Sequence, residues 1–363
     1  MIPQSANLFR VYNNLMLVTE NLAVINFIAI IASMKFIVMK YNRKVYKNCF
    51  YDMLVLSELL GFYAKDLENA KVKEDIETMK QSEKISNRMS IMGNVLGLGT
   101  VVIYMIQRFF LIATAKMKGL ERIFVFQSLF PEIFKVTPHY ELVCLSQLMG
   151  GFMITTCYVS VDSLIYVLIF NICAQLQILR KELNEVINLL GIQQCPDDFQ
   201  QAIRIVVRKH EHLNWCVKTV EDSFNYCFLV QALLSTLLMC FQAFMTFQAM
   251  AISDNIPVND IVFLIVYITV VMLLIHFYCY MGEELLISSS ELSDGVFESN
   301  WYSLSSRNIK MLTFIIFRSR IPLQLTAGKF NVLSMETYAN IVKAAVGYFS
   351  VMVQLETGRQ QTD

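Results

Sequence analysis

Long apolar blocks recur along this chain and are separated by polar, charged segments. Six of these blocks approach or exceed the length of about 20 residues that an α-helix needs to cross the hydrocarbon core of a bilayer. They cover residues 22–39, 91–115, 142–172, 224–251, 258–281 and 337–355. Because the blocks are continuous and not short alternating strands, they predict helices and exclude a transmembrane barrel. The sequence therefore predicts an all-α, polytopic transmembrane helical bundle that forms a single domain over residues 1–363.

The composition supports a membrane protein and offers little chemistry. Hydrophobic residues make up 55% of the chain and charged residues 17%, with a mean hydropathy of +0.48, which is more apolar than a soluble domain requires. Nine scattered cysteines without a Cys-x-x-Cys motif predict packing residues and no disulfide framework or metal site. No phosphate-binding loop, catalytic triad or facing pair of carboxylates within the spans is present, so we expect no enzyme or transporter, no cofactor, no metal and no nucleic-acid partner.

Basic residues are concentrated in alternate connections between the apolar blocks. Residues 41–90 hold nine, residues 173–223 hold six and residues 282–336 hold five, whereas residues 116–141 hold four and residues 252–257 hold none. The positive-inside rule therefore places the first three segments in the cytosol and the C-terminus outside the cell. A G-protein-coupled receptor has its C-terminus inside, so the charge pattern predicts an inverted topology and argues against that class.

The cytosolic segments carry helical patterns. Apolar residues recur at three- and four-residue steps from Leu176 to Leu190, which predicts that the span over 142–172 continues into the cytosol as an amphipathic helix. The mixed charges over Lys71–Lys84 indicate a solvated helix face. Within residues 282–336, Trp301 is the expected buried anchor.

The ionisable residues that stand out within the predicted spans, where such groups are expensive, are Lys35, Arg108, Asp162 and Lys343. Lys35 is near the cytosolic end of its helix and is expected to extend its amine towards the interface. Asp162 lies about 30 Å along its helix from Leu142, close to the cytosolic boundary. Arg108 is near the outer end of its span, too far from Asp162 to pair with it, and Glu20 is the better partner. We expect both Asp162 and Arg108 to make buried polar contacts between helices.

The last apolar helix has a possible pore-lining face. Val351 and Leu355 are four residues apart and so lie on one helix face. Repeated around a symmetry axis, they would form two apolar rings, which can close a pore by excluding water. Gln354 would add a neutral hydrogen-bonding group, and Glu356 would place acidic charge at the outer mouth, which favours cations. The alternative is an ordinary packed transmembrane helix.

The C-terminal segment Phe317–Glu356 also carries a resemblance. A charged link containing a proline leads into Ala327-Gly328-Lys329-Phe330, and a short polar stretch then precedes the final helix. This order resembles the C-terminal signature of insect odorant receptors. Gly282-Glu283 and Trp301 match marks of the same family, Thr137–Leu142 matches more loosely, and the resemblance extends from about Asn21 to Glu356. The tail "YFSVMVQL" resembles that of the family's co-receptor, whose gate uses the matching valine and leucine with the glutamine beside them.

The resemblance implies a specific function. It implies a tuning subunit of an odorant-gated, non-selective cation channel that forms a heterotetramer with the odorant co-receptor, through residues 282–336 and the final helix. Such a subunit is a multi-pass protein of the plasma membrane, surrounded by lipid, in the dendrite of an olfactory sensory neuron. The family has seven spans and only six are visible here, which leaves open a truncated sequence or a six-span subunit. A gustatory receptor channel, which shares the fold but differs in its C-terminal signature, is the alternative.

The resemblance also implies where a volatile odorant binds. In the family the pocket lies between the second, third, fourth and sixth helices, in their outer halves. The residues of this sequence expected to face it are Asn21, Ile25, Tyr104, Arg108, Phe152, Thr156, Phe263 and Tyr267. Aromatic and apolar side chains provide contact that depends mainly on shape, which suits small volatile ligands.

Overall fold

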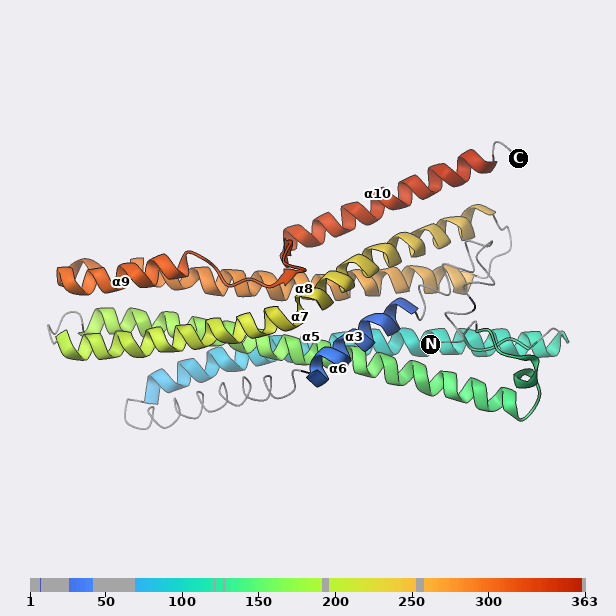
Figure 1. The fold of residues 1–363 in the computed structure, drawn as a ribbon, viewed down its shortest axis with the longest axis horizontal. Helices are drawn as coiled ribbons and strands as arrows, with labels where there is room; N and C mark the ends of the chain where they lie inside the picture. Colours follow the sequence, from blue (N-terminus) through green and yellow to red (C-terminus); the bar gives the residue numbers. More distant parts are fainter. Residues whose placement is uncertain are drawn as a thin grey trace.

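The computed structural model describes Asn7 and residues 26–41, 69–119, 122–126, 128–190, 196–252 and 258–360. Four long helices run alternately up and down along the long axis of the molecule (Figure 1): α5 (Asn69–Met117), α6 (His139–Glu185), α7 (Pro196–Ile252) and α8 (Val258–Phe297). The shorter helices are α3 (Phe27–Tyr41), α9 (Ser306–Ser319) and α10 (Met335–Gln360). Among the described residues, these four long helices are also the ones that are long and apolar enough to cross a membrane.

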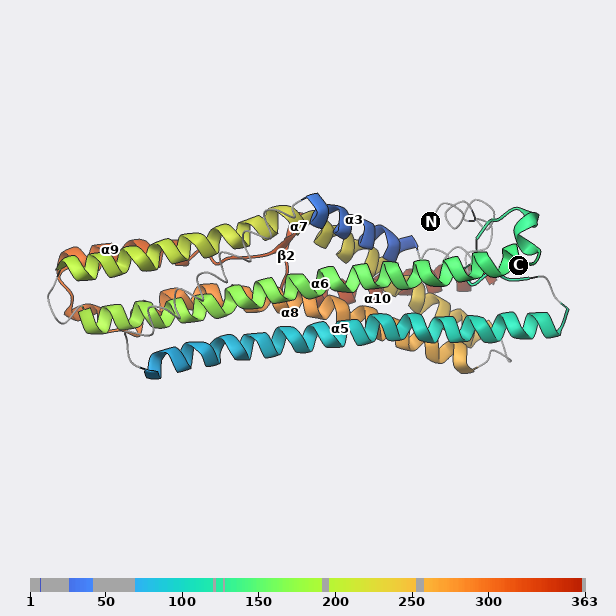
Figure 2. The same ribbon diagram turned by 90° about the horizontal axis from the view of Figure 1, so that it is seen from below.

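These four helices coincide with four of the six predicted spans. The other two predicted spans, over residues 22–39 and 337–355, correspond to α3 and α10, and their crossing of the membrane stays a prediction. Helix α6 lies at the centre of the bundle, since it packs against α3, α5, α7 and α8 and is buried along most of residues 158–183. Helix α5 lies at the edge (Figure 2) and exposes large apolar side chains, as expected of a face that meets lipid.

Helix ends that are predicted to lie on the same side of the membrane lie at the same end of the molecule. The C-terminal ends of α5, α7 and α10 lie at one end, together with the starts of α6 and α8 (Figure 1). The opposite end holds α9 and the segments predicted to be cytosolic around it. Helix α6 continues to Glu185 and ends in one π-helical turn, Val186–Leu190, which confirms that this span extends as a helix beyond the apolar block.

Helix α9 runs back along the bundle from the end that is predicted to be cytosolic (Figure 1). The hydroxyl of Ser305 caps its first turn by accepting a hydrogen bond from the Asn308 N–H. Leu312 and Ile315 form its buried stripe. Trp301 is 37% exposed, so the prediction of a buried anchor is wrong for the single subunit. It lies in a short 3-10 turn, where the chain reverses between α8 and α9.

A two-stranded hairpin links α9 to α10 and docks on α7. Its strands β1 (Thr326–Ala327) and β2 (Asn331–Val332) are antiparallel, and Gly328 takes a φ of +65°, a value that favours glycine. The Gly328 N–H donates to the Asn225 carbonyl at 2.9 Å. The Thr326 N–H donates to the Glu221 carboxylate at 2.8 Å, and the Thr326 hydroxyl donates to the same carboxylate.

The same hairpin contacts α8 and begins α10. Gly282 lies so close to Leu333 that a Cβ at residue 282 would overlap the Leu333 carbonyl oxygen. The next residue, Glu283, accepts a hydrogen bond from the Met335 N–H at 3.2 Å, at the first residue of α10. The base of α10 is therefore held on both α7 and α8, halfway along the bundle (Figure 1).

Candidate functional site

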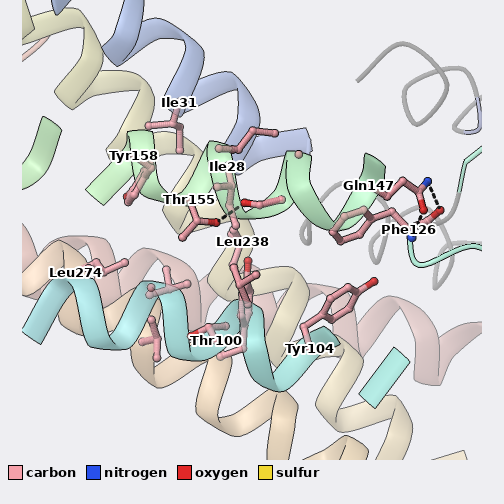
Figure 3. Close-up of a pocket in the computed structure, with 18 of the residues that line it drawn as sticks. Ile28, Ile31, Thr100, Tyr104, Phe126, Gln147, Thr155, Tyr158, Leu238 and Leu274 are labelled. Atoms are coloured by element: carbon pink, nitrogen blue, oxygen red, sulfur yellow. Dashed lines mark hydrogen bonds between the residues drawn. The ribbon is translucent and has the colours of Figure 1, made fainter. Parts of the chain in front are cut away.

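A cavity of about 310 Å³ lies inside the bundle, within the apolar parts of the helices. Helices α3, α5, α6, α7 and α8 all contribute to it, and the segment around Phe126 and Phe130 covers one side (Figure 3). Most of the lining is aliphatic or aromatic. The larger side chains of the lining include Tyr104, Phe126, Gln147, Tyr158, Gln231, Phe263 and Tyr267.

Aromatic rings form one wall of the cavity. The Tyr104 ring stacks on Phe126 with centroids 5.6 Å apart, and it lies 5.8 Å from Phe263, which in turn stacks on Tyr267 at 6.0 Å. Gly151 permits the approach of Phe126, because a Cβ at residue 151 would lie 3.2 Å from the Phe126 ring. These contacts bring α5, α6 and α8 together around the cavity.

The amide of Gln147 fixes the covering segment in place. Its Oε1 accepts from the Phe126 N–H at 3.2 Å and its Nε2 donates to the Phe126 carbonyl at 3.3 Å (Figure 3). The hydroxyls of Thr100 and Thr155 donate to carbonyls of their own helices, at Leu96 and Gly151. These three polar groups are therefore already satisfied within the protein.

A buried ion pair lies beside the cavity. Lys35 Nζ is 2.5 Å from Asp162 Oδ1 and 2.9 Å from the Tyr278 hydroxyl, which donates to the same carboxylate oxygen at 2.5 Å. The Lys35 and Asp162 side chains are 1% and 2% exposed. The cluster joins α3, α6 and α8. The expectation that Lys35 extends towards the interface is therefore wrong, whereas the expected buried contact between helices at Asp162 is confirmed.

The pocket residues predicted from the sequence are only partly brought together. Tyr104, Phe263 and Tyr267 line the cavity. Arg108 is buried one turn further along α5, and its Nε donates to the Tyr104 hydroxyl at 2.8 Å. Its expected partner, Glu20, lies outside the described residues, as do Asn21 and Ile25.

The two predicted residues of α6 face away from the cavity. Phe152 and Thr156 are exposed on the outside of the bundle. Their neighbours Gly151 and Thr155 line the cavity in their place, and Figure 3 shows Thr155 pointing into it. One residue is about 100° of helical rotation, since a turn takes 3.6 residues, so a shift of one residue moves a side chain off the cavity-facing side.

The end of α10 is largely unpacked in the single subunit. Val351 is 54% exposed and Gln354 is also exposed, while the side chains of Leu355 and Glu356 lie outside the described part. Closer to its base the helix touches α7 and α8. Val351 and Gln354 thus lie on a helix that leaves apolar side chains such as Val346 and Tyr348 exposed in the single subunit.

Several residues around the cavity are missing from the sequence-based prediction. Gln147 and Gln231 lie within apolar blocks, and polar side chains in such blocks signal a contact between helices. The ion pair had a clearer signal, because Lys35 and Asp162 have opposite charges and both lie at the cytosolic ends of their spans.

The chain was compared with known proteins. The family model described as "7tm Odorant receptor" matches residues 15–346. The chain is 21% identical to Odorant receptor 9a of Drosophila melanogaster, over 90% of this chain and 79% of the relative. It is 25% identical to the Drosophila melanogaster Odorant receptor coreceptor, over 43% of this chain and 31% of that protein.

The fold also matches a solved structure. The insect olfactory receptor OR5 from Machilis hrabei, in complex with eugenol, superposes with a TM-score of 0.73 at 15% sequence identity. The match covers 94% of this chain and 82% of that receptor. The helical arrangement described above is therefore the fold of that receptor.

Proposed function

Because this chain belongs to the family of seven-transmembrane odorant receptors, we propose that it binds a volatile odorant and, together with the odorant co-receptor, opens a cation channel. It acts as the tuning subunit of a heterotetramer, and the co-receptor supplies the remaining subunits. The partial alignment with a co-receptor sequence supports the proposal that the two kinds of subunit pack into one channel in the same way. The subunit resides in the plasma membrane of an olfactory sensory neuron, in its dendrite.

The cavity is the observation that carries this proposal. Its volume of about 310 Å³ lies at the lower end of the range for ligand pockets, about 300–1,000 Å³, which suits a small molecule. Its aromatic wall joins α5 and α8 through the segment around Phe126, which packs on Gly151 of α6, so a bound ligand can change how these helices pack. A ligand shifts the closed–open equilibrium only by its difference in affinity for the two states.

The pore belongs to α10 in this proposal. The C-terminal end of α10 lies at the same end of the molecule as the junction between α5 and α6 (Figure 1). The charge pattern puts that end outside the cell. Residues 282–336 lie towards the other end and supply contacts between subunits in the cytosol. Each subunit then contributes Val351, Gln354, Leu355 and Glu356 to the outer part of the pore.

Reducing the cavity should change which odorants are effective. Gly150 lines the cavity, and a Cβ there would meet no atom within 4 Å, so Gly150→Leu places a side chain in empty space. We expect the half-maximal concentration of the best odorants to rise about tenfold or more, since the added leucine removes ligand volume. Patch-clamp recording of cells that also express the co-receptor measures this effect.

Gly99→Leu is the matched control. Gly99 also has no atom within 4 Å of its Cβ position, but it does not line the cavity. This variant should retain the odorant profile of the unmodified receptor. If Gly150→Leu and Gly99→Leu had the same profile, the odorant would bind elsewhere. If no odorant evoked current while the co-receptor responded to its own agonist, the proposed function would be wrong.

The gate can be tested separately from the pocket. Leu355→Ser should raise current in the absence of odorant, because a polar ring no longer excludes water from the constriction. Leu355→Val keeps the ring apolar and should keep the resting current low. Glu356→Gln should lower cation preference modestly without changing the resting current. Resting currents that are equal in Leu355→Ser and Leu355→Val, at equal surface expression, would remove this residue from the gate.

A further inference from the structure

Two polar side chains of the cavity, Gln231 and Tyr158, have hydrogen-bonding groups that are not satisfied within the described part of the chain. Gln231 on α7 and Tyr158 on α6 both line the cavity, and the Gln231 Nε2 donates to the Tyr158 hydroxyl at 2.5 Å. They are 5% and 8% exposed, respectively. Within the described residues, Gln231 Oε1 is buried without a hydrogen-bond partner. This atom is an acceptor for which the described part of the chain provides no donor.

The Tyr158 hydroxyl complements this acceptor. It accepts from Gln231, and its own proton is not given to any acceptor in the described part of the chain. These two lining residues therefore hold one unused donor and one unused acceptor. If the amide is rotated by 180°, the Tyr158 hydroxyl donates to the amide oxygen, and the free groups become an N–H donor and the hydroxyl lone pair. In either orientation a donor and an acceptor remain.

We propose that the ligand of this cavity carries a hydroxyl group, as an alcohol or a phenol, which hydrogen-bonds to Gln231 and Tyr158. A hydroxyl both donates and accepts, so it satisfies the two free groups together. An ether, ester or ketone only accepts and leaves the acceptor unpartnered, and a hydrocarbon satisfies neither group. This inference rests on the proposed function and specifies the chemical class of its odorants.

Charged ligands do not fit the same site. The described lining contains no aspartate, glutamate, lysine, arginine or histidine, so an ionised ligand would lack a counter-ion. Lys35 and Asp162 lie nearby but are paired with each other. A neutral hydroxyl is thus the polar group that this lining can bind.

The pair is held in place before any ligand arrives. The ammonium of Lys35 lies over the Tyr158 ring, 3.7 Å from its centroid, and Asp162 and Tyr278 fix that ammonium. The Tyr158 ring therefore has a fixed position between the ion pair and the cavity. A preorganised donor and acceptor favour ligands whose hydroxyl matches their positions.

The test compares isomers that differ only in their hydroxyl group. The first pair is 1-octanol with heptyl methyl ether, and the second is 4-methylphenol with anisole. In cells that also express the co-receptor, we expect at least one hydroxyl compound to act at about a tenfold lower half-maximal concentration than its ether isomer. Gln231→Leu should abolish this difference by weakening the response to the hydroxyl compound while keeping the response to the ether. Tyr158→Phe should reduce the difference, since it removes only one partner.

Thr269→Val is the control for loss of a polar group. Its hydroxyl is exposed on the outside of α8 and does not line the cavity, so the preference for the hydroxyl compound should persist. Surface labelling and the response to the ether establish that each variant folds. Equal potency of alcohols and ethers, or a preference that survives Gln231→Leu, would overturn this inference and leave the proposed function intact. Failure of a broad odorant panel, with a responsive co-receptor, would overturn both.

Discussion

Replacing Asp162 with leucine should remove most of the protein from the cell surface. The variant leaves the Lys35 ammonium buried without its carboxylate, and breaking a buried ion pair in this way costs about 3–5 kcal/mol. Folded proteins are stable by only about 5–15 kcal/mol, so this loss is a large share of the total. Surface biotinylation and thermal unfolding of the purified receptor in detergent measure the loss. The double variant Lys35→Met/Asp162→Leu should recover most of it, because apolar replacement of both partners is often neutral or stabilising.

An exposed ion pair provides the matched control. Lys181 Nζ lies 2.8 Å from Glu74 Oε1, and both side chains are more than a third exposed. Lys181→Met should change stability far less than Asp162→Leu, because surface ion pairs contribute little. If Asp162→Leu were as mild as Lys181→Met, the buried pair would not stabilise the contact of α3, α6 and α8. If the double variant were as damaging as the single one, the ion pair itself would be required.

Gly282→Ala should detach the base of α10 from the bundle. A Cβ at residue 282 would overlap the backbone carbonyl of Leu333, and backbone cannot move aside as a flexible side chain can. Overpacking of this kind costs about 1–3 kcal/mol. The contact lies beside the hydrogen bond from Met335 to Glu283, so the strain falls where α10 begins. We expect lower surface expression, and lower odorant-evoked current in the protein that remains.

Gly347→Ala tests whether any alanine in this region would do the same. Gly347 lies within α10, and a Cβ there would meet no atom within 4 Å in the single subunit. Alanine is also the better helix former by about 1 kcal/mol, so this variant should be stable. Expression and current that are normal in Gly282→Ala would show that α8 and the hairpin can separate without consequence.

The sequence predicts the helices well because their signal is local. An apolar block of sufficient length predicts a span by itself, and the periodicity over 176–190 predicts the continuation of α6, which the structure confirms. The side of a helix that faces the cavity is harder to predict, because each residue turns a side chain by about 100°. On α5 and α8 the sequence places Tyr104 and Phe263 towards the cavity, whereas on α6 it favours Phe152 where Gly151 is the lining residue.

Contacts between distant segments are the part that the sequence does not reveal. Gly282-Glu283 and Ala327–Phe330 are recognisable as separate marks, but nothing in either indicates that Gly282 packs on Leu333 or that Gly328 binds Asn225. Such contacts depend on how whole helices are placed relative to one another. Lys35 shows the same difficulty, since its side chain is consistent with an interfacial position until Asp162 is located beside it.

The partners of the buried ion pair are far apart in the sequence, and this separation has a consequence for membrane insertion during synthesis. Lys35 precedes Asp162 by 127 residues and Tyr278 by 243. At a translation rate of about 5–20 residues per second, Asp162 is synthesised about 6–25 seconds after Lys35, so Lys35 has no partner carboxylate during that interval. An unpaired charged side chain opposes insertion of a membrane helix, by about 2.5–3.5 kcal/mol at the helix centre and by less near an end, where Lys35 lies. As a predicted span, α3 is therefore expected to become fully stable in the bilayer only after α6 has been synthesised. Quality-control factors that detect unpaired charges in the membrane would have that interval in which to act.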